Sequence, residues 1–238
     1  MLSEAAHRPS RSSAIEDYAK AIYALQSRTG TAVSTNALAE RLGVTAGSAS
    51  GMVRKLDELG LVSHVPYKGV ELTEPGRKLA LEVLRHHRLL ELYLAESLGL
   101  PWDRVHAEAE VLEHHISEEL EELIAAKLGN PTHDPHGDPI PTRELEIEEG
   151  DSESLAGLAP GDRGRFVRIS DSEPEMLRYL AERGIRPGDA FEVIDRQPFG
   201  GPLFVRFAAA PGVALGEGDP VHVLGGALAA AMRVEVGA

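Results

Sequence analysis

Apolar residues recur along the first third of the chain at the three- and four-residue spacing of amphipathic helices. The pattern predicts a helix over residues 13–27 and two shorter helices over 37–42 and 46–59. A serine or threonine suited to capping precedes each shorter helix, and a glycine follows it. Two brief strand-like runs, 61–65 and 69–73, come next. Three helices followed by a hairpin are typical of a winged helix-turn-helix.

Two long helices are predicted after the hairpin. The first covers residues 74–98 and has a proline in its first turn, and the second begins after Pro101 and continues to Leu128. Residues 130–142 then hold four prolines, which predicts a semi-rigid linker. We expect a domain boundary within or just after this linker, near residues 143–150.

Beyond residue 155 the apolar period shortens to that of β-strands. One helix is expected over 174–184. Short runs separated by Gly/Pro turns are strand candidates at 164–170, 190–196, 202–208, 220–226 and 232–236. This pattern fits a small five-stranded barrel of SH3-like size.

Composition narrows the classes of function. The chain has no cysteine, which excludes disulfides, cysteine-based zinc fingers and thiol catalysis. No apolar run approaches the roughly 18 residues of a membrane helix, and no signal-peptide pattern opens the chain, so a cytoplasmic protein without membrane contact is expected. The net charge of −14 at first argues against a nucleic-acid binder. Residues 1–73 nevertheless carry eight basic against seven acidic residues. The excess of acidic residues therefore lies in the rest of the chain, where cations rather than DNA are the expected partners.

The predicted third helix has the features of a DNA-reading element. Its first turns are small and polar, so the helix can sit deep in the major groove with its hydroxyls near phosphates or base edges. Basic residues follow one turn later and at the tip of the predicted wing. The candidate DNA contacts are Thr45, Gly47, Ser48, Ser50, Arg54, Lys55, Tyr67 and Lys68. The alternative is that the small residues serve close helix packing and the basic ones are solvated.

Histidines and glutamates recur at helical spacing in both long helices. His87 and Glu91 are four residues apart and share a face of the first. The candidates expected along one stripe of the second are His106, Glu110, Glu113 and His114. Converging imidazoles and carboxylates are the ligands that a divalent ion needs, although each histidine alone could be a solvated or capping residue. His133 and His136, in the proline-rich linker, are interpreted as turn residues.

Six segments resemble the DtxR/MntR family of metal-dependent repressors in order and spacing: IEDYAKAIYAL, LAERLGV, SGMVRKLDELGLV, VELTEPGRKLA, RHHRLLELYL and VHAEAEVLEHHIS. AEVLEH and DPHGDPIP resemble actinobacterial manganese regulators of the MntR kind in particular. The resemblance covers nearly the whole chain and implies a mainly α protein with a small β domain. Its parts would be a winged helix-turn-helix over 1–73, a helical dimerisation and metal-binding domain over 74–143, and an SH3-like or FeoA-like domain over 144–238.

The resemblance also implies two metal positions in each subunit. The primary position would use Asp17, Glu110, Glu113 and His114. The ancillary position would use His87, Glu91 and His106. Acids of the C-terminal domain would complete it; Asp171 and Glu175 are the best matches, and Glu173 is a competing choice. A simpler alternative is that these acids cap the helix that follows them.

The function that the resemblance implies is a repressor that binds operator DNA as a homodimer when loaded with a divalent metal. Iron-type members place a methionine and a cysteine where this chain has Asp17 and Glu110, so the oxygen-rich ligands favour Mn²⁺, with Fe²⁺ as the other candidate. Short manganese regulators have a glutamate where this chain has Lys20, which argues against a tight pair of manganese ions at the primary position.

Two other classes of protein fit the sequence less well than a metal-dependent repressor. A metalloenzyme would use the glutamates as general bases, but the chain has no HExxH motif and no nucleophile in a supporting context. A winged-helix regulator that senses an organic ligand would leave the histidine and glutamate stripe unexplained.

Overall fold

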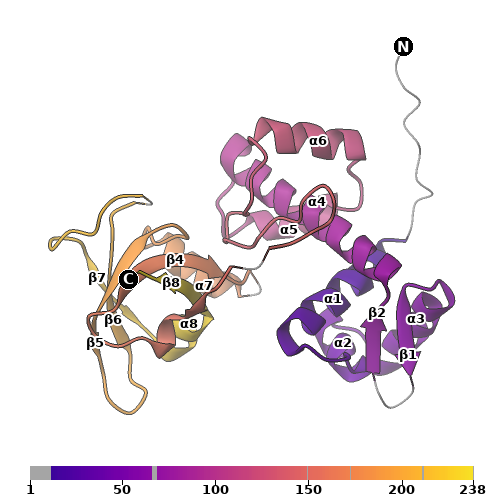
Figure 1. The fold of residues 1–238 in the computed structure, drawn as a ribbon, viewed down its shortest axis with the longest axis horizontal. Helices are drawn as coiled ribbons and strands as arrows, with labels where there is room; N and C mark the ends of the chain where they lie inside the picture. The colour runs from indigo at the N-terminus through magenta and orange to yellow at the C-terminus, as the bar shows by residue number, and fades with distance from the viewer. Residues whose placement is uncertain (1–11, 66–68, 149, 172, 211, 238) are drawn as a thin grey trace. The chain divides into compact units, whose positions relative to one another are not determined.

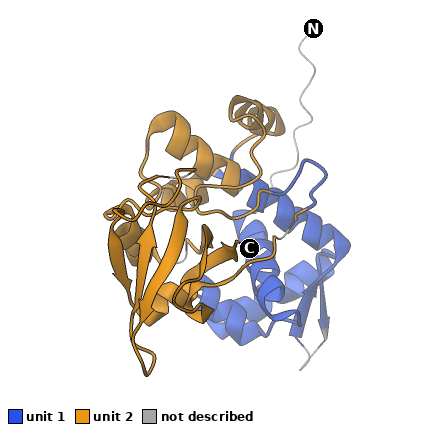
Figure 2. Ribbon diagram, turned by 60° about the vertical axis from the view of Figure 1, so that its left-hand side comes forward, with its two compact units in different colours: residues 1–86, 113–115, 141–146 blue, residues 87–112, 116–140, 147–238 orange. Residues whose placement is uncertain are grey.

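A computed structural model describes residues 12–65, 69–148, 150–171, 173–210 and 212–237 (Figure 1). The chain divides into two compact units (Figure 2). The first unit consists of residues 1–86, 113–115 and 141–146, and the second consists of residues 87–112, 116–140 and 147–238. None of the helices in the described ranges combines the length and apolar character needed to cross a membrane.

The first unit begins with the predicted winged helix-turn-helix. Its elements are α1 (Ser13–Thr29), α2 (Thr35–Leu42), α3 (Ala46–Glu58) and the antiparallel strands β1 (Val62–Val65) and β2 (Gly69–Leu72). Side chains from all three helices and the hairpin form one buried core.

Local capping sets the start of two of these helices. The Ser34 side chain accepts a hydrogen bond from the Ala37 backbone N–H, and Thr45 accepts one from Ser48. The predicted caps are therefore confirmed.

The long helix α4 (Glu74–Leu98) matches its prediction, but the second long helix does not exist as predicted. Two shorter helices, α5 (Val105–Leu112) and α6 (Glu118–Lys127), take its place, and Glu113 and His114 lie in the turn between them. Ser117 starts the new helix because its hydroxyl accepts a hydrogen bond from the Leu120 N–H. Three glutamates in the first turn of α6 add favourable charge at the helix N-terminus.

The C-terminal part is a six-stranded antiparallel sheet with strand order β3-β8-β4-β5-β6-β7. It contains the five predicted strands and one very short addition, β3. The strand bounds are β3 (Glu153–Ser154), β4 (Arg163–Ile169), β5 (Ala190–Arg196), β6 (Leu203–Phe207), β7 (Val221–Leu224) and β8 (Met232–Val236). The 3-10 turn η1 (Leu155–Gly157) and the helices α7 (Pro174–Ala181) and α8 (Gly226–Ala231) accompany it, and residues of the sheet and both helices share a second core.

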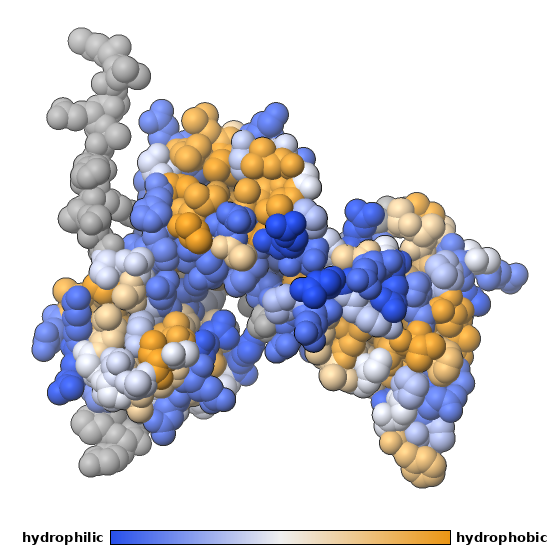
Figure 3. Space-filling view, turned by 180° about the vertical axis from the view of Figure 1, so that it is seen from behind, coloured by the Kyte–Doolittle hydropathy of each residue, from blue (hydrophilic) through white to orange (hydrophobic). Residues whose placement is uncertain are grey.

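Apolar side chains also gather on the exposed surface of the helices α4–α6 (Figure 3). Leu98, Val111, Leu120 and Leu123 are between 45% and 65% exposed. Exposed apolar side chains that cluster in this way commonly mark a site of protein association. We call the residues Leu98, Val111, Leu112, Leu120 and Leu123 the apolar helical face.

Gly76 provides a test of the packing between α4 and the hairpin. A Cβ atom added there would lie 1.8 Å from the Leu61 carbonyl oxygen, which the Thr73 N–H holds in place. We expect Gly76→Ala to destabilise the protein by about 1–3 kcal/mol or more, because the Leu61 backbone must move to make room for the added methyl group. Gly51→Ala, at a helical position with open space around it, should stabilise by about 0.5–1 kcal/mol. Thermal unfolding followed by circular dichroism checks both, and equal effects of the two variants would contradict the packing argument.

Candidate functional site

Three ionisable side chains converge in the first unit. Asp17 lies on α1, and Glu113 and His114 lie in the turn that follows α5. His114 Nε2 is 2.9 Å from Asp17 Oδ1 and 3.5 Å from Glu113 Oε1. One ligand atom from each of the three residues lies within 4.8 Å of the other two. We call Asp17, Glu113 and His114 the first cluster.

The break between α5 and α6 is what frees Glu113 and His114 to face α1. His86 Nδ1, on α4, lies 3.1 Å from the Glu113 carbonyl oxygen and donates to it in the matching tautomer, which anchors the turn. A continuous helix would have kept Glu113 and His114 on the predicted stripe.

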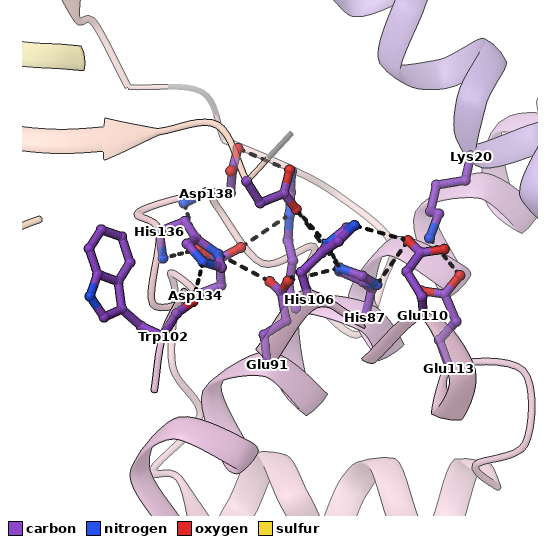
Figure 4. A network of polar contacts seen from close by, with 12 residues as sticks. Lys20, His87, Glu91, Trp102, His106, Glu110, Glu113, Asp134, His136 and Asp138 are labelled. Carbon is purple, nitrogen blue, oxygen red and sulfur yellow. Dashed lines mark hydrogen bonds and ion pairs between the residues drawn. The ribbon is translucent and has the colours of Figure 1, made fainter. Parts of the chain in front are cut away.

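Two residues of α1 balance the charges of the first cluster. Lys20 Nζ lies 2.6 Å from Glu113 Oε1, whose side chain is fully buried (Figure 4). A buried carboxylate requires such a cationic partner. Glu16 Oε2 lies 2.6 Å from His114 Nδ1. A carboxylate on one ring nitrogen orients an imidazole and leaves its other nitrogen, here Nε2, directed at the ligand position, as in many metal sites.

Four side chains converge in the second unit, and we call them the second cluster: His87, Glu91, His106 and Asp171. His87 and Glu91 stand one turn apart on α4, as predicted from their spacing. Glu91 Oε1 lies 3.0 Å from His87 Nε2 and 3.3 Å from His106 Nδ1. Asp171, which follows β4, brings its Oδ2 to 2.9 Å from His106 Nδ1. Two imidazole nitrogens and two carboxylate oxygens therefore point at one small volume, which fits a divalent cation.

The carboxylates of the second cluster favour positive charge on His106. Hydrogen bonds to Asp171 and Glu91 raise the pKa of His106 to about 10. Burial opposes ionisation of Glu91, but the charge of His87 and hydrogen bonds to the surrounding histidines hold the Glu91 pKa well below its usual value. A divalent ion bound by these carboxylates would take the place of the histidine protons, so metal binding here would release protons.

The structure brings together seven of the nine predicted metal ligands in these two clusters. Glu110, on α5, was predicted beside Asp17. Its Oε1 lies 3.6 Å from His87 Nδ1 and 3.8 Å from His106 Nε2 of the same unit, and its place in the primary position stays a prediction. Glu175 is exposed in the first turn of α7 and belongs to none of the ligand groups found among the described residues.

Sequence reasoning missed two buried residues of the linker. Asp134 and His136 are 8% and 0% exposed, and they form a third group of ligand atoms with Glu91. Buried residues of a loop follow no regular spacing, so the sequence pattern gave no sign that these two side chains are buried. The proline-rich composition indicated only a linker. The only signal was the alternation of Asp and His in DPHGD.

The candidate DNA contacts lie on the outer face of α3. Ala49, Val53 and Leu56 point into the core, whereas Arg54 and Lys55 are exposed. Thr45, Gly47 and Ser48 are exposed as well, and Ser50 is half-buried. The small residues at the start of α3 thus leave an open surface at the helix N-terminus. Tyr67 and Lys68 lie outside the described residues.

Comparison with known families covers most of the chain. Residues 11–70 match the iron dependent repressor N-terminal DNA binding domain, and residues 73–142 match the iron dependent repressor metal binding and dimerisation domain. Residues 153–236 match the FeoA domain.

Similar proteins include an iron-dependent repressor and a diphtheria toxin repressor. The iron-dependent repressor IdeR of Mycobacterium tuberculosis is 38% identical over 157 residues, which is 66% of this chain and 64% of that protein, so the match spans less than two thirds of the relative. The diphtheria toxin repressor of Corynebacterium efficiens is 32% identical over 76% of this chain and 83% of its own length.

Solved structures agree over more of the chain. A manganese-dependent transcriptional repressor in complex with manganese is 43% identical, with a TM-score of 0.82, and the alignment covers 93% of this chain and 99% of that one. The manganese regulator SloR is 28% identical with a TM-score of 0.71, covering 94% of this chain and 98% of that one. With all three domain types present in order and whole-length structural matches, the chain belongs to the DtxR/MntR family of metal-dependent repressors.

Proposed function

We propose that this protein is a manganese-responsive transcriptional repressor, which binds operator DNA as a homodimer when it is loaded with divalent metal. The observation that carries the proposal is the convergence of Asp17, Glu113 and His114 in the same unit as an exposed helix-turn-helix. Because operator DNA lies in the bacterial cytoplasm, the proposal also gives the protein a cytoplasmic location.

The donor atoms of both clusters favour a hard ion. Carboxylate oxygens and imidazole nitrogens make up the two sets, and sulfur is absent from them. Such ligands suit Mn²⁺ or Fe²⁺, whereas methionine and cysteine would favour softer ions. We infer that Mn²⁺ is the effector and that Fe²⁺ is the alternative.

Asp17 connects the first cluster to the DNA-binding core. Its neighbours on α1, Ile15 and Tyr18, are buried in the core that also contains Ala49 and Val53 of α3. Asp17, Glu113 and His114 would hold a divalent ion, whose positive charge would offset the repulsion between the two carboxylates. The position of Asp17 then restrains α1, and the packing of the shared core passes this restraint to α3. The DNA-competent arrangement of α3 is favoured as a result.

Two exposed surfaces support DNA binding and dimer formation. The outer face of α3 offers hydroxyls and two basic side chains to a major groove. The apolar helical face provides a surface for a second copy, since homodimer interfaces are more apolar than the rest of a protein's surface.

Replacement of Asp17 tests the role of the first cluster. We expect Mn²⁺ to raise the operator affinity of the unaltered protein by roughly 5–150-fold, the usual range of allosteric coupling. Asp17→Asn removes a charged ligand and should abolish most of this gain. Glu144→Gln, at an exposed acid of the same unit, should retain it. Titration of fluorescent genomic fragments that include the protein's own promoter, after chelation and with Mn²⁺ or Fe²⁺ restored, measures the effect.

The same titration separates the proposal from its rivals. DNA binding that ignores the chelator would indicate a sensor of some other ligand, and a full metal response in Asp17→Asn would exclude the first cluster as the switch. A stronger response to Fe²⁺ than to Mn²⁺ would retain the repressor and change its effector.

Arg54 tests the DNA-contacting face of α3. If its guanidinium binds a phosphate, Arg54→Ala should weaken binding to operator fragments and to unrelated DNA fragments by similar factors. The slope of log affinity against log salt should fall by about 0.9 for the lost contact. Lys78→Ala removes an equal charge from an exposed position of α4 and should leave the slope unchanged. A loss confined to one operator sequence would instead indicate that Arg54 reads a base.

Leu123 tests the apolar helical face. Leu123→Asp places a charge on a side chain that is 62% exposed in the single chain. If a second copy covers this side chain, burial worth about 1.5–3 kcal/mol is lost and the dimer dissociation constant should rise at least about tenfold. Val221→Asp, on an exposed valine of β7, is the matched control. Sedimentation equilibrium measures both, and an unchanged constant for Leu123→Asp would place the dimer interface elsewhere.

A further inference from the structure

The contact between the C-terminal sheet and the helices of the second unit is largely polar. The sheet shares one core with α7 and α8, whereas α4, α5 and α6 contribute to another. A cavity of about 600 Å³ is lined by residues of α4, the proline-rich loop (residues 130–142), β4 and β8. Among the described residues before 150, Trp102 is the one that packs against the core of the sheet. Polar contacts are therefore needed to hold the two parts in one arrangement.

The proline-rich loop contacts β4 through its backbone. The Ile169 N–H donates to the His136 carbonyl at 3.0 Å. A Cβ atom at Gly137 would lie 1.8 Å from the Val167 carbonyl oxygen, so the two backbones are in direct contact. Asp171 of the second cluster follows Ile169 by two residues. The contacts that hold this end of β4 on the loop therefore also set the position of Asp171.

Three charged side chains reinforce the contact, and we call them the ion-pair strap: Arg88, Asp138 and Arg168. Arg168 Nε, on β4, lies 2.9 Å from Asp138 Oδ1 in the loop. Arg88 Nη2, on α4, lies 3.3 Å from the same oxygen. Arg88 also donates to the Pro139 carbonyl, and its Nε is 3.8 Å from Asp134 Oδ2. The Asp138 carboxylate, which lies in the polar network of Figure 4, thus joins α4 to β4.

The place of Arg168 in the sheet is unfavourable without the strap. Arg168 is in register with Arg233 of β8, and like charges directly opposite one another destabilise a sheet. The register of β4 on β8 also shifts between Phe166 and Arg168, and such a bulge can redirect a side chain. Arg233 donates to Ser152, whereas Arg168 pairs with Asp138. The contact with the loop, rather than the sheet, therefore explains an arginine at this position.

Both ends of the ion-pair strap lie close in sequence to ligands of the second cluster. Arg88 directly follows His87 on α4, and Arg168 precedes Asp171 by three residues. The side chains of Arg88 and Asp138 are each 13% exposed, so dissolved ions screen their attraction only weakly. The strap consequently restrains the distance between the ligands of α4 and the one ligand that follows β4.

We propose that the ion-pair strap positions Asp171 in the second cluster, and that Arg168 is a positioning residue for the ion bound there. His87, Glu91 and His106 come from the helices, so the cluster is complete only while β4 is held against them. Groups behind a metal site commonly orient its ligands in this way. This inference rests on the proposed function, because it assumes that the second cluster binds a divalent ion.

The Mn²⁺ affinity of the full chain tests the strap. Titration with MnCl₂, with free Mn²⁺ measured by electron paramagnetic resonance, gives the dissociation constants, and the step that Asp171→Asn weakens belongs to the second cluster. Arg168→Gln should raise the dissociation constant of that step roughly 10–100-fold, the usual effect of losing a group that orients metal ligands. Arg168→Lys keeps a positive charge beside Asp138 and should retain most of the affinity. Arg163→Gln, at an arginine of the same strand that pairs with Glu192, should leave the affinity unchanged.

A double variant distinguishes the positioning of Asp171 from general stabilisation. If Arg168 acts through Asp171, Arg168→Gln should weaken the same step little further once Asp171→Asn is present, because both substitutions remove one contribution. Losses that add in full would overturn the positioning role.

Hydrogen exchange of the metal-free protein gives a second readout. Arg168→Gln should speed exchange of the Ile169 N–H, because its hydrogen bond to the His136 carbonyl would open more often. Arg163→Gln should leave this rate unchanged. Circular dichroism in the presence of chelator confirms that each variant is folded.

The outcomes separate this inference from the proposed function. An unchanged Mn²⁺ affinity of the second cluster in Arg168→Gln, with metal-dependent DNA binding of the unaltered protein intact, would overturn the strap alone. An unaltered protein that binds no Mn²⁺ at all would overturn both.

Discussion

The arrangement of this molecule depends on carboxylates that are buried away from water. Glu91 and Glu113 have fully buried side chains, and an isolated ionised carboxylate at such depth would cost many kcal/mol. Each therefore needs cationic or hydrogen-bonding partners from other segments of the chain. Glu113 obtains them from α1, and Glu91 obtains them from α5 and the proline-rich loop. The need to neutralise these two groups explains why residues distant in sequence converge.

Backbone interruptions then decide which side chains can meet. The five residues between α5 and α6 turn Glu113 and His114 toward α1, and the tight approach at Gly137 holds the linker loop on β4. Helices supply the candidate ligands Asp17, His87, Glu91 and His106. Glu113, His114 and Asp171 come from turns and loops, where chain direction can change within a few residues. Turns and loops thus complete both candidate clusters, which the helices begin.

Much of the fold could be predicted because periodicity reports burial in regular elements. The winged helix-turn-helix, α4 and five strands followed from the spacing of apolar residues and from local caps. The break after Leu112 was missed because the apolar pattern continues across it, although Ser117 carried a capping signal. Asp134 and His136 were missed for a different reason. Their positions depend on how loops and helices pack in three dimensions, and no local pattern records that packing. For the same reason only the structure could distinguish Asp171 from its neighbouring acids.

Lys20 has a consequence for the protein during metal starvation. Its ammonium group already compensates the interior carboxylate of Glu113, and Glu16 already orients His114. The chain can therefore reach its native state before any ion arrives, unlike small zinc domains whose folding waits for their metal. Starvation would then leave an intact pool of sensor that resists proteolysis. Transcription could respond to returning metal at the speed of ion binding, without new protein synthesis.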